Sequence, residues 1–143
     1  MLQLEMVDNI GDITPSPNKL ARRLLIVDDD LAIAEVIREI ATSQSFAVRI
    51  VTQPRDFVAA CSEFSPDVIT LDLLMPELDG IEMLTYLGKH NCRARIILLS
   101  GAEGPLLSAA QRIGLAGGLR IDGVLAKPMQ IGELYRLLDE RPE

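Results

Sequence analysis

Short apolar runs alternate with longer stretches of helical periodicity along most of this chain. The apolar runs have the length and continuity of strands that are buried on both faces; they cover residues 23–27, 46–51, 67–71, 95–99 and 121–126. Apolar residues recur at three- and four-residue spacing in the stretches that follow, which predicts helices with one apolar face; these stripes are Ile33, Ile37 and Ile40, then Phe57, Cys61 and Phe64, then Ile81, Leu84 and Leu87, then Leu106, Ala110 and Ile113, and last Ile131, Leu134 and Leu138. The alternation predicts a parallel sheet.

This pattern places the chain in the α/β class. Right-handed crossovers put helices on both faces of a parallel sheet, so residues 22–140 are expected to form one domain with a five-stranded, doubly wound sheet. Pro54 and Pro105 suit helix starts, and the glycine-rich stretch 114–120 is expected to be a loop. Residues 1–21 show no apolar periodicity and are expected to be a flexible lead-in, with residues 141–143 as a short tail.

Polar side chains occupy the positions where four of the strands are expected to end. They are Asp28, Asp29 and Asp30 after the first strand, Asp72 after the third, Ser100 after the fourth, and Lys127 with Pro128 after the fifth. The carboxyl ends of parallel strands meet at one edge of the sheet, where doubly wound folds bind their ligands. These side chains are therefore expected to share one crevice.

An acidic crevice of this kind needs a compensating cation, because clustered carboxylates repel one another. Mg²⁺ suits oxygen ligands and usually binds through one or two carboxylates plus phosphate oxygens. A carboxylate can also act as a nucleophile and form an aspartyl phosphate, and phosphoryl transfer needs mainly in-line positioning and charge stabilisation. Asp72 is placed for that role, and the cation and Lys127 together could neutralise an incoming phosphoryl group.

Four motifs, found in this order, resemble those of the receiver domains of two-component response regulators. The resemblance covers about residues 22–138, and its motifs are LLIVDDD at 24–30, LDLLMPELDG at 71–80, LLSG at 98–101 and LAKP at 125–128. It implies the flavodoxin-like receiver fold with strand order 2-1-3-4-5. It also implies that a sensor histidine kinase or phosphotransfer protein phosphorylates Asp72, and that an output domain or effector protein reads the resulting conformational change. Homodimerisation stays open.

The resemblance also implies a role for each residue of the crevice. Asp29 would bind Mg²⁺ directly together with Asp72, the phosphoacceptor, while Asp28 would act mainly through metal-bound water. The backbone carbonyl of Leu74 would complete the protein ligands.

The other strand ends would serve the phosphoryl group. Ser100 would hydrogen-bond one phosphoryl oxygen and Lys127 would pair with another, with a cis peptide bond before Pro128. Asp30 is expected to cap the first helix.

Val124 stands where many receivers carry an aromatic switch residue, so coupling is expected to run through residues 100–104 and the fourth helix. The GLR…GVLAKP stretch is similar to that of receivers attached to EAL-type phosphodiesterases.

Three other functions are alternatives to that of a phosphorylated receiver. Phosphatases of the haloacid-dehalogenase type use a second aspartate two residues after the nucleophile, whereas Leu74 occupies that place here. A flavodoxin-like carrier is disfavoured because the loop after the first strand is acidic and would repel a flavin phosphate. A constitutive protein-binding module that keeps the receiver fold without being phosphorylated stays open as the alternative.

Composition and net charge limit the expected binding partners, metal ligands and cellular location. The net charge of −7 opposes nonspecific binding to nucleic acid or to an anionic membrane, and no apolar stretch is long enough to cross a bilayer. The chain has two cysteines and one histidine, His90, without zinc-ligand spacing, and none of the three is assigned a catalytic role. No secretory signal pattern opens the sequence, so a cytoplasmic location is the expectation.

Overall fold

A computed structural model describes residues 11–14, 21–75, 80–101 and 104–140. The remaining residues predicted as lead-in, the middle of the LDLLMPELDG motif at 76–79, residues 102–103 of the proposed coupling segment, and the predicted tail at 141–143 lie outside these ranges.

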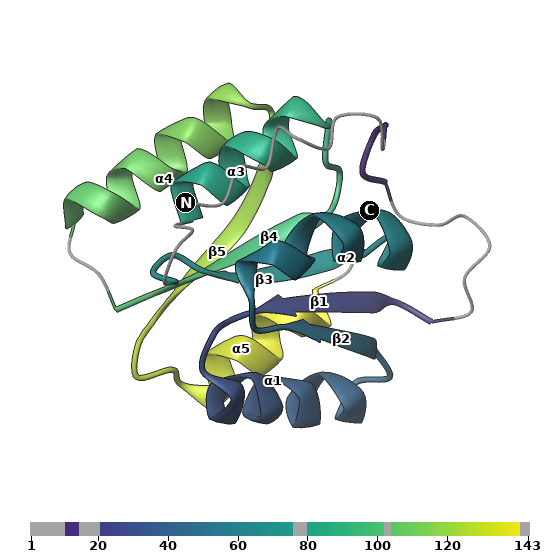
Figure 1. Ribbon diagram of the computed structural model, residues 1–143. Helices are drawn as coiled ribbons and strands as arrows, with labels where there is room; N and C mark the ends of the chain where they lie inside the picture. Colours follow the sequence, from purple (N-terminus) through teal and green to yellow (C-terminus); the bar gives the residue numbers. More distant parts are fainter. Residues whose placement is uncertain (1–10, 15–20, 76–79, 102–103, 141–143) are drawn as a thin grey trace.

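Each of the five strands is followed by a helix, as the sequence pattern predicts (Figure 1). The strands are β1 (Arg23–Val27), β2 (Ala47–Val51), β3 (Val68–Asp72), β4 (Arg95–Ser100) and β5 (Arg120–Ala126). The helices are α1 (Leu31–Ser43), α2 (Phe57–Phe64) with a short 3₁₀ turn η2 (Pro54–Asp56) before it, α3 (Gly80–Lys89), α4 (Gly104–Ala116) and α5 (Ile131–Asp139). Over the described ranges, no helix combines the length and apolar character needed to cross a membrane.

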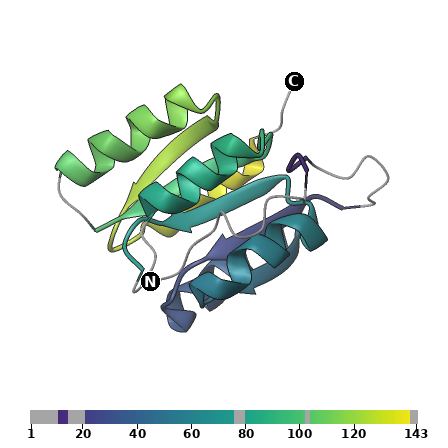
Figure 2. The same ribbon diagram turned by 45° about the horizontal axis from the view of Figure 1, so that its top comes forward.

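All neighbouring strands pair in parallel, and their order is β2-β1-β3-β4-β5, which confirms the expected strand order. Helices α1 and α5 cover one face of the sheet, and α2, α3 and α4 cover the other (Figures 1 and 2). The doubly wound architecture is therefore confirmed. It brings the carboxyl ends of β1, β3, β4 and β5 to the same edge of the sheet.

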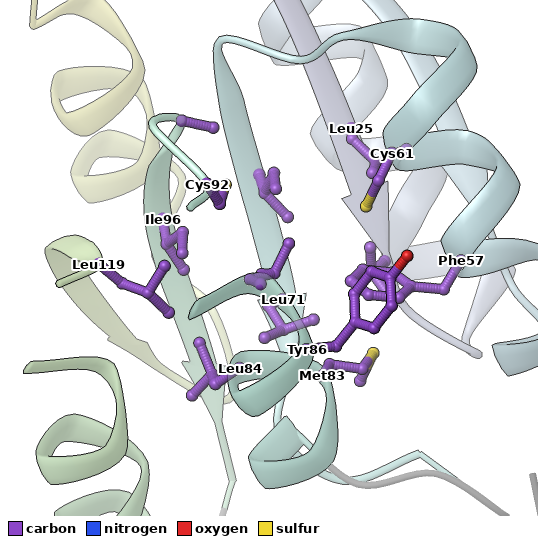
Figure 3. Close-up of a cluster of buried hydrophobic side chains, with 14 of the residues drawn as sticks. Leu25, Phe57, Cys61, Leu71, Met83, Leu84, Tyr86, Cys92, Ile96 and Leu119 are labelled. Carbon is purple, nitrogen blue, oxygen red and sulfur yellow. The ribbon is translucent and has the colours of Figure 1, made fainter. Parts of the chain in front are cut away.

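Side chains from alternate strand positions build a core on each face of the sheet. In β1, Leu25 and Val27 pack under α2, α3 and α4, whereas Leu24 and Ile26 pack under α1 and α5. Figure 3 shows the first of these cores, in which the Tyr86 ring from α3 lies beside Phe57 from α2. Burial raises the pKa of the Cys61 thiol in this core, and burial also raises the pKa of Cys92, to about 11. Both thiols therefore stay protonated near neutral pH.

Two details after β4 differ from the sequence prediction. The stretch predicted as a loop at 114–120 is not one loop, because α4 continues to Ala116 and β5 begins at Arg120. Two of its three glycines serve close packing: an added Cβ at Gly114 would lie 3.0 Å from Ile121, and one at Gly117 would lie 3.2 Å from the Gly88 Cα. The third, Gly118, has a φ of +73° in the short turn before β5. The second difference is Ile131, which was expected to cover the sheet but is exposed at the start of α5.

Residues 11–14 also differ from expectation. They belong to the predicted lead-in, yet they lie against the turn after α3, and the Ile13 side chain is buried in the core under α2, α3 and α4. The apolar pattern of one isoleucine among polar neighbours was too weak to predict this contact.

Thr70 provides a stability prediction. Its hydroxyl is buried in the middle of β3, between Ile26 and Ile97 of the neighbouring strands, and it has no hydrogen-bond partner among the described residues. Because an unsatisfied buried hydroxyl destabilises the folded state, Thr70→Val is expected to raise the free energy of unfolding by about 1 kcal/mol in urea denaturation. A fall in that free energy would show that the hydroxyl has a stabilising partner.

Candidate functional site

The predicted crevice lies at the carboxyl edge of the sheet. β1 ends at Val27, so the next two aspartates project beyond the sheet, and β3 ends in Asp72 itself. β4 ends in Ser100, and β5 stops one residue before Lys127. A backbone hydrogen bond from the Lys127 N–H to the Ser100 carbonyl, 3.1 Å long, ties the last two strand ends together.

Three carboxylates meet at this edge. One oxygen from each of Asp28, Asp29 and Asp72 lies within 4.8 Å of the others. Asp28 and Asp72 are almost completely buried, with 1% and 3% of their surfaces exposed, whereas Asp29 faces solvent. The cluster is therefore open on the side of Asp29.

Backbone N–H groups hold the two buried carboxylates in place. The Asp30 N–H donates to Asp28 Oδ1 at 2.9 Å, and the Leu74 N–H donates to Asp72 Oδ1 at 3.1 Å. The other oxygen of each carboxylate faces Lys127, whose Nζ lies 3.1 Å from Asp72 Oδ2 and 3.6 Å from Asp28 Oδ2. A single ammonium thus stands against two buried carboxylates.

The electrostatics of this arrangement favour one more positive charge. Burial, followed by repulsion from Asp72, raises the pKa of Asp28 to about 6, although the Asp30 N–H and Lys127 act in the opposite direction. Burial lowers the pKa of Lys127, but attraction to Asp28 and its hydrogen bond with Asp72 outweigh that effect and raise it overall. Lys127 is therefore charged at neutral pH and still does not fully compensate its neighbours.

A divalent cation fits this site. Asp28 Oδ2 is buried and makes no hydrogen bond within the described ranges, where its nearest compensating group is the ammonium at 3.6 Å. This oxygen is therefore suited to a hard cation or to a water molecule bound to one. All donors in the cluster are carboxylate oxygens, which suit Mg²⁺. The acidic cluster can therefore hold a metal ion.

The remaining predicted residues lie around the cluster. Ser100 is buried at the end of β4, and the Lys127–Pro128 peptide bond is cis. Leu74 follows Asp72 closely on the way out of β3, and its role as a ligand through the backbone carbonyl stays a prediction. Asp30 caps α1 as expected, since its Oδ1 accepts hydrogen bonds from the N–H groups of Ala32 and Ile33.

Gly80 lets α3 begin close to the end of β3. Its N–H donates to the Leu73 carbonyl at 3.0 Å, and an added Cβ would lie 2.5 Å from Leu73 Cδ2 and 2.9 Å from the Leu73 Cα. Any larger residue would have to move Leu73, which is next to Asp72. Gly80 therefore sets the position of the site from outside it.

The raised pKa of Asp28 gives a prediction about metal binding. Ligand carboxylates must lose their proton to bind a cation, so Mg²⁺ affinity is expected to fall about tenfold between roughly pH 7.5 and pH 5, the range over which Asp28 becomes protonated. Isothermal titration of Mg²⁺ at both pH values measures the ratio. Equal affinities at the two pH values would show that Asp28 does not take part.

With this geometry established, comparison with known proteins assigns the family. The sequence pattern of the response regulator receiver domain matches residues 24–139. The chain therefore belongs to the response regulator receiver domain family, whose members are signalling modules.

Individual relatives agree with this assignment. The chain is 35% identical over 95 residues to the chemotaxis protein CheY of Bacillus subtilis, and the alignment covers 64% of this chain and 79% of CheY. It is 31% identical over 113 residues to the response regulator MprA of Mycolicibacterium vanbaalenii, and this alignment covers 78% of this chain but only 46% of MprA. The chain therefore spans about half the length of that relative. The crystal structure of a receiver domain from Bermanella marisrubri superimposes with a TM-score of 0.71 at 30% identity, covering 81% of this chain and 93% of the other.

Proposed function

We propose that this chain is a phosphorylation switch in which Asp72 accepts a phosphoryl group with the help of Mg²⁺. The observation that carries the proposal is the placement of the Asp72 carboxylate between the Lys127 ammonium, 3.1 Å away, and two further carboxylates that together can hold a cation. A nucleophilic carboxylate flanked by positive charge is the arrangement that phosphoryl transfer to aspartate requires.

The transfer step follows from these residues. An Asp72 carboxylate oxygen attacks the phosphorus of the donor in line with the leaving group, so that one O–P bond forms while the bond between phosphorus and the donor breaks. For a phosphohistidine donor the bond broken is P–N, and the imidazole leaves with its electron pair. Mg²⁺ held by Asp28, Asp29 and Asp72, with the Leu74 carbonyl, would neutralise charge on the phosphoryl oxygens.

Lys127 and Ser100 would then hold the product. Lys127 already contacts Asp72, so its ammonium can pair with a phosphoryl oxygen as soon as the carboxylate is phosphorylated. Ser100 lies at the end of β4, next to β3, and its hydroxyl can donate to a second phosphoryl oxygen. These two contacts differ between the free and phosphorylated states, so they can shift the balance between two conformations of the domain.

The outer segment of the switch would be residues 100–104 and α4. Val124 is only partly buried and packs against the core under α4. Because it is a valine, it offers no aromatic ring that could follow a movement of Ser100. Residues 102–103 lie outside the described ranges. We therefore assign the coupling to the Ser100 end of β4 and to α4, which begins at Gly104.

The phosphodonor would dock beside Lys127. A cavity of about 310 Å³ opens there, lined by Lys127 and by apolar parts of α1 and of the segment that leads into α5; the lining is completed by Ala32, Ile33, Val36, Pro128, Met129 and Ile131. Val36 and Ile131, which line this cavity, are large exposed apolar residues. Such a surface suits a helix of a histidine kinase or phosphotransfer protein. The proposal also includes a cytoplasmic location and an output domain or effector protein that binds the phosphorylated form.

The proposal is tested by treating the purified chain with acetyl phosphate in the presence and absence of Mg²⁺ and weighing the intact protein by mass spectrometry. The expected result is a single phosphoryl adduct that forms only with Mg²⁺ and disappears slowly by hydrolysis. Absence of an adduct under conditions where Mg²⁺ is shown to bind would overturn the proposal in favour of a constitutive binding module.

A further inference from the structure

The four residues at 11–14, here called the strap, are held against the domain through both backbone groups of one residue. The Ile13 N–H donates to the His90 carbonyl at 2.9 Å, and the Ile13 carbonyl accepts from the Arg93 N–H at 3.0 Å. The Ile13 side chain is 2% exposed and belongs to the core that contains Tyr86 and Cys92. Figures 1 and 2 show the strap as a short purple segment beside the end of α3.

Two side chains of the turn recognise the residues before Ile13. His90 Nδ1 lies 3.1 Å from the Gly11 carbonyl, which can only accept, so Nδ1 carries the hydrogen. Asn91 Nδ2 donates to Asp12 Oδ1 at 3.0 Å. The His90 residue is 7% exposed, and its ring packs on Tyr86 with 4.4 Å between ring centroids. His90, to which the sequence assigned no role, therefore forms one wall of the strap's seat.

This seat, here called the notch, is formed by residues 90–93 between α3 and β4. It lies where β4 begins, so it is at the opposite edge of the sheet from Asp72, which ends β3. The notch accepts one aliphatic side chain, bonds both backbone groups of that residue, and adds one contact to the carboxylate before it. These are the features of a site for an extended peptide.

The strap is expected to leave this seat readily. Docking buries one large aliphatic side chain and forms two backbone hydrogen bonds, but it also fixes the backbone of four residues. The free energy gained from such burial and bonding is of the same order as the conformational entropy lost, so neither state dominates strongly. The five strands and five helices are expected to keep their own contacts when the strap leaves, because the strap is not one of these elements and contributes a single side chain to the core.

We propose that the notch is a docking site for an extended peptide with a central aliphatic residue, which the strap of the same chain occupies and leaves without unfolding of the domain. The occupant is the chain's own segment. Other segments of the same chemistry, with an acidic residue just before the aliphatic one, would compete for the notch, and the proposal is independent of phosphorylation.

Amide hydrogen exchange in the full chain, followed by NMR, tests the proposal. In the wild type, the Ile13 and Arg93 amides are expected to have similar protection factors and to exchange at least about tenfold faster than the amides of β4, which exchange only when the domain unfolds. In Ile13→Asp, the Arg93 amide is expected to exchange at least about tenfold faster than it does in the wild type. Its matched control is Thr14→Asp, the same new charge at the exposed neighbouring position, which should leave that rate within about twofold of wild type.

A second pair of variants keeps the test valid if Ile13→Asp disturbs the core. Gly11 has a φ of +77°, and an added Cβ would meet nothing within 4 Å. Gly11→Val therefore strains only the docked backbone and is expected to speed Arg93 exchange, whereas Gly11→Asn, which tolerates this conformation better, is expected to stay closer to wild type. A synthetic peptide with the sequence of residues 9–15 should slow exchange again in Gly11→Val, and the same peptide with aspartate in place of Ile13 should not.

Three results would overturn the proposal. If the Arg93 amide exchanges as slowly as the amides of β4 in the wild type, the strap is a fixed part of the domain. If the Gly11 and Ile13 substitutions leave the exchange of this amide unchanged, the strap makes no contact in solution. If its protection falls on dilution of the protein, a second copy supplies the strap. Phosphorylation by acetyl phosphate serves as the activity control and should be unchanged in Gly11→Val.

Discussion

Asp72→Asn is expected to remove phosphorylation by acetyl phosphate almost completely, by on the order of 1,000-fold or more, which is the usual scale for loss of a covalent nucleophile. Asparagine keeps the shape of the side chain, and its carbonyl oxygen can still accept the Leu74 N–H bond, so the fold should survive. What is lost is the negative charge and with it the attacking carboxylate. Intact-mass spectrometry over time measures the effect.

The control for this variant is Asp56→Asn. Asp56 precedes α2, is exposed, and makes no capping bond through its side chain. The same chemical change at this position should leave the rate of phosphorylation at its wild-type value. A phosphoryl adduct that persists at a similar level in Asp72→Asn would mean that another residue is the acceptor.

Asp28→Asn is expected to change two properties in opposite directions. Mg²⁺ affinity should fall by about 10- to 100-fold, because the carboxylate that orients the metal or its water is gone. The metal-free domain should nevertheless become more stable at pH 7. Ionised Asp28 is buried and repelled by Asp72, and a pKa raised from 3.8 to about 6 corresponds to roughly 3 kcal/mol of unfavourable free energy at neutral pH.

This free energy compares ionised with protonated Asp28 and already includes the attraction to Lys127. Asparagine replaces a protonated carboxyl only in part, so about 1–2 kcal/mol is expected in urea unfolding without Mg²⁺. The sign can be checked with pH. The folded state of the wild type binds the proton more tightly than the unfolded state, so its stabilisation from protonated Asp28 is complete below about pH 4 and is lost as pH rises through about 6. The difference between variant and wild type should therefore be large at pH 7 and small at pH 4.

Asp30→Asn is the matched control for this second variant. It removes one negative charge from the same loop, but asparagine is an equally good helix cap, so the bonds to Ala32 and Ile33 can be kept. Both Mg²⁺ affinity and stability should remain close to wild type. A variant Asp28→Asn that is less stable than wild type at pH 7 would contradict the account of the site as an electrostatically strained cluster.

Much of this fold could be predicted from sequence because its signals are local and repeated. Most of the strands are nearly continuous apolar runs, and each helix shows an apolar stripe. The polar residues at the strand ends, Asp28, Asp72, Ser100 and Lys127, follow from those boundaries. The convergence of these residues is a property of any parallel sheet, which is why the acidic cluster could be expected before any coordinates.

The features that sequence could not predict depend on contacts between distant segments. Arg95 begins β4 as the edge of an apolar run, yet its guanidinium is buried and donates to Asp122 and to the Leu137 carbonyl. Ile13 gave no periodic signal, and its partner His90 lies in a distant part of the chain. The glycines at 114, 117 and 118 predicted a loop because glycine is usually found in loops. Only Gly118 has the positive φ of a turn, whereas close packing of α4 on β5 and of Gly117 on Gly88 is what needs small residues at the other two positions.

The measurement that tests the central claim most directly is the location of the phosphoryl group. The chain is phosphorylated with acetyl phosphate and Mg²⁺, reduced with borohydride, which converts an aspartyl phosphate to homoserine, and then digested and sequenced by mass spectrometry. We expect homoserine at position 72 and unmodified aspartate at positions 28 and 29. Homoserine at position 28 or 29, or none in protein that carries a phosphoryl adduct, would contradict the assignment of Asp72 as the phosphoacceptor.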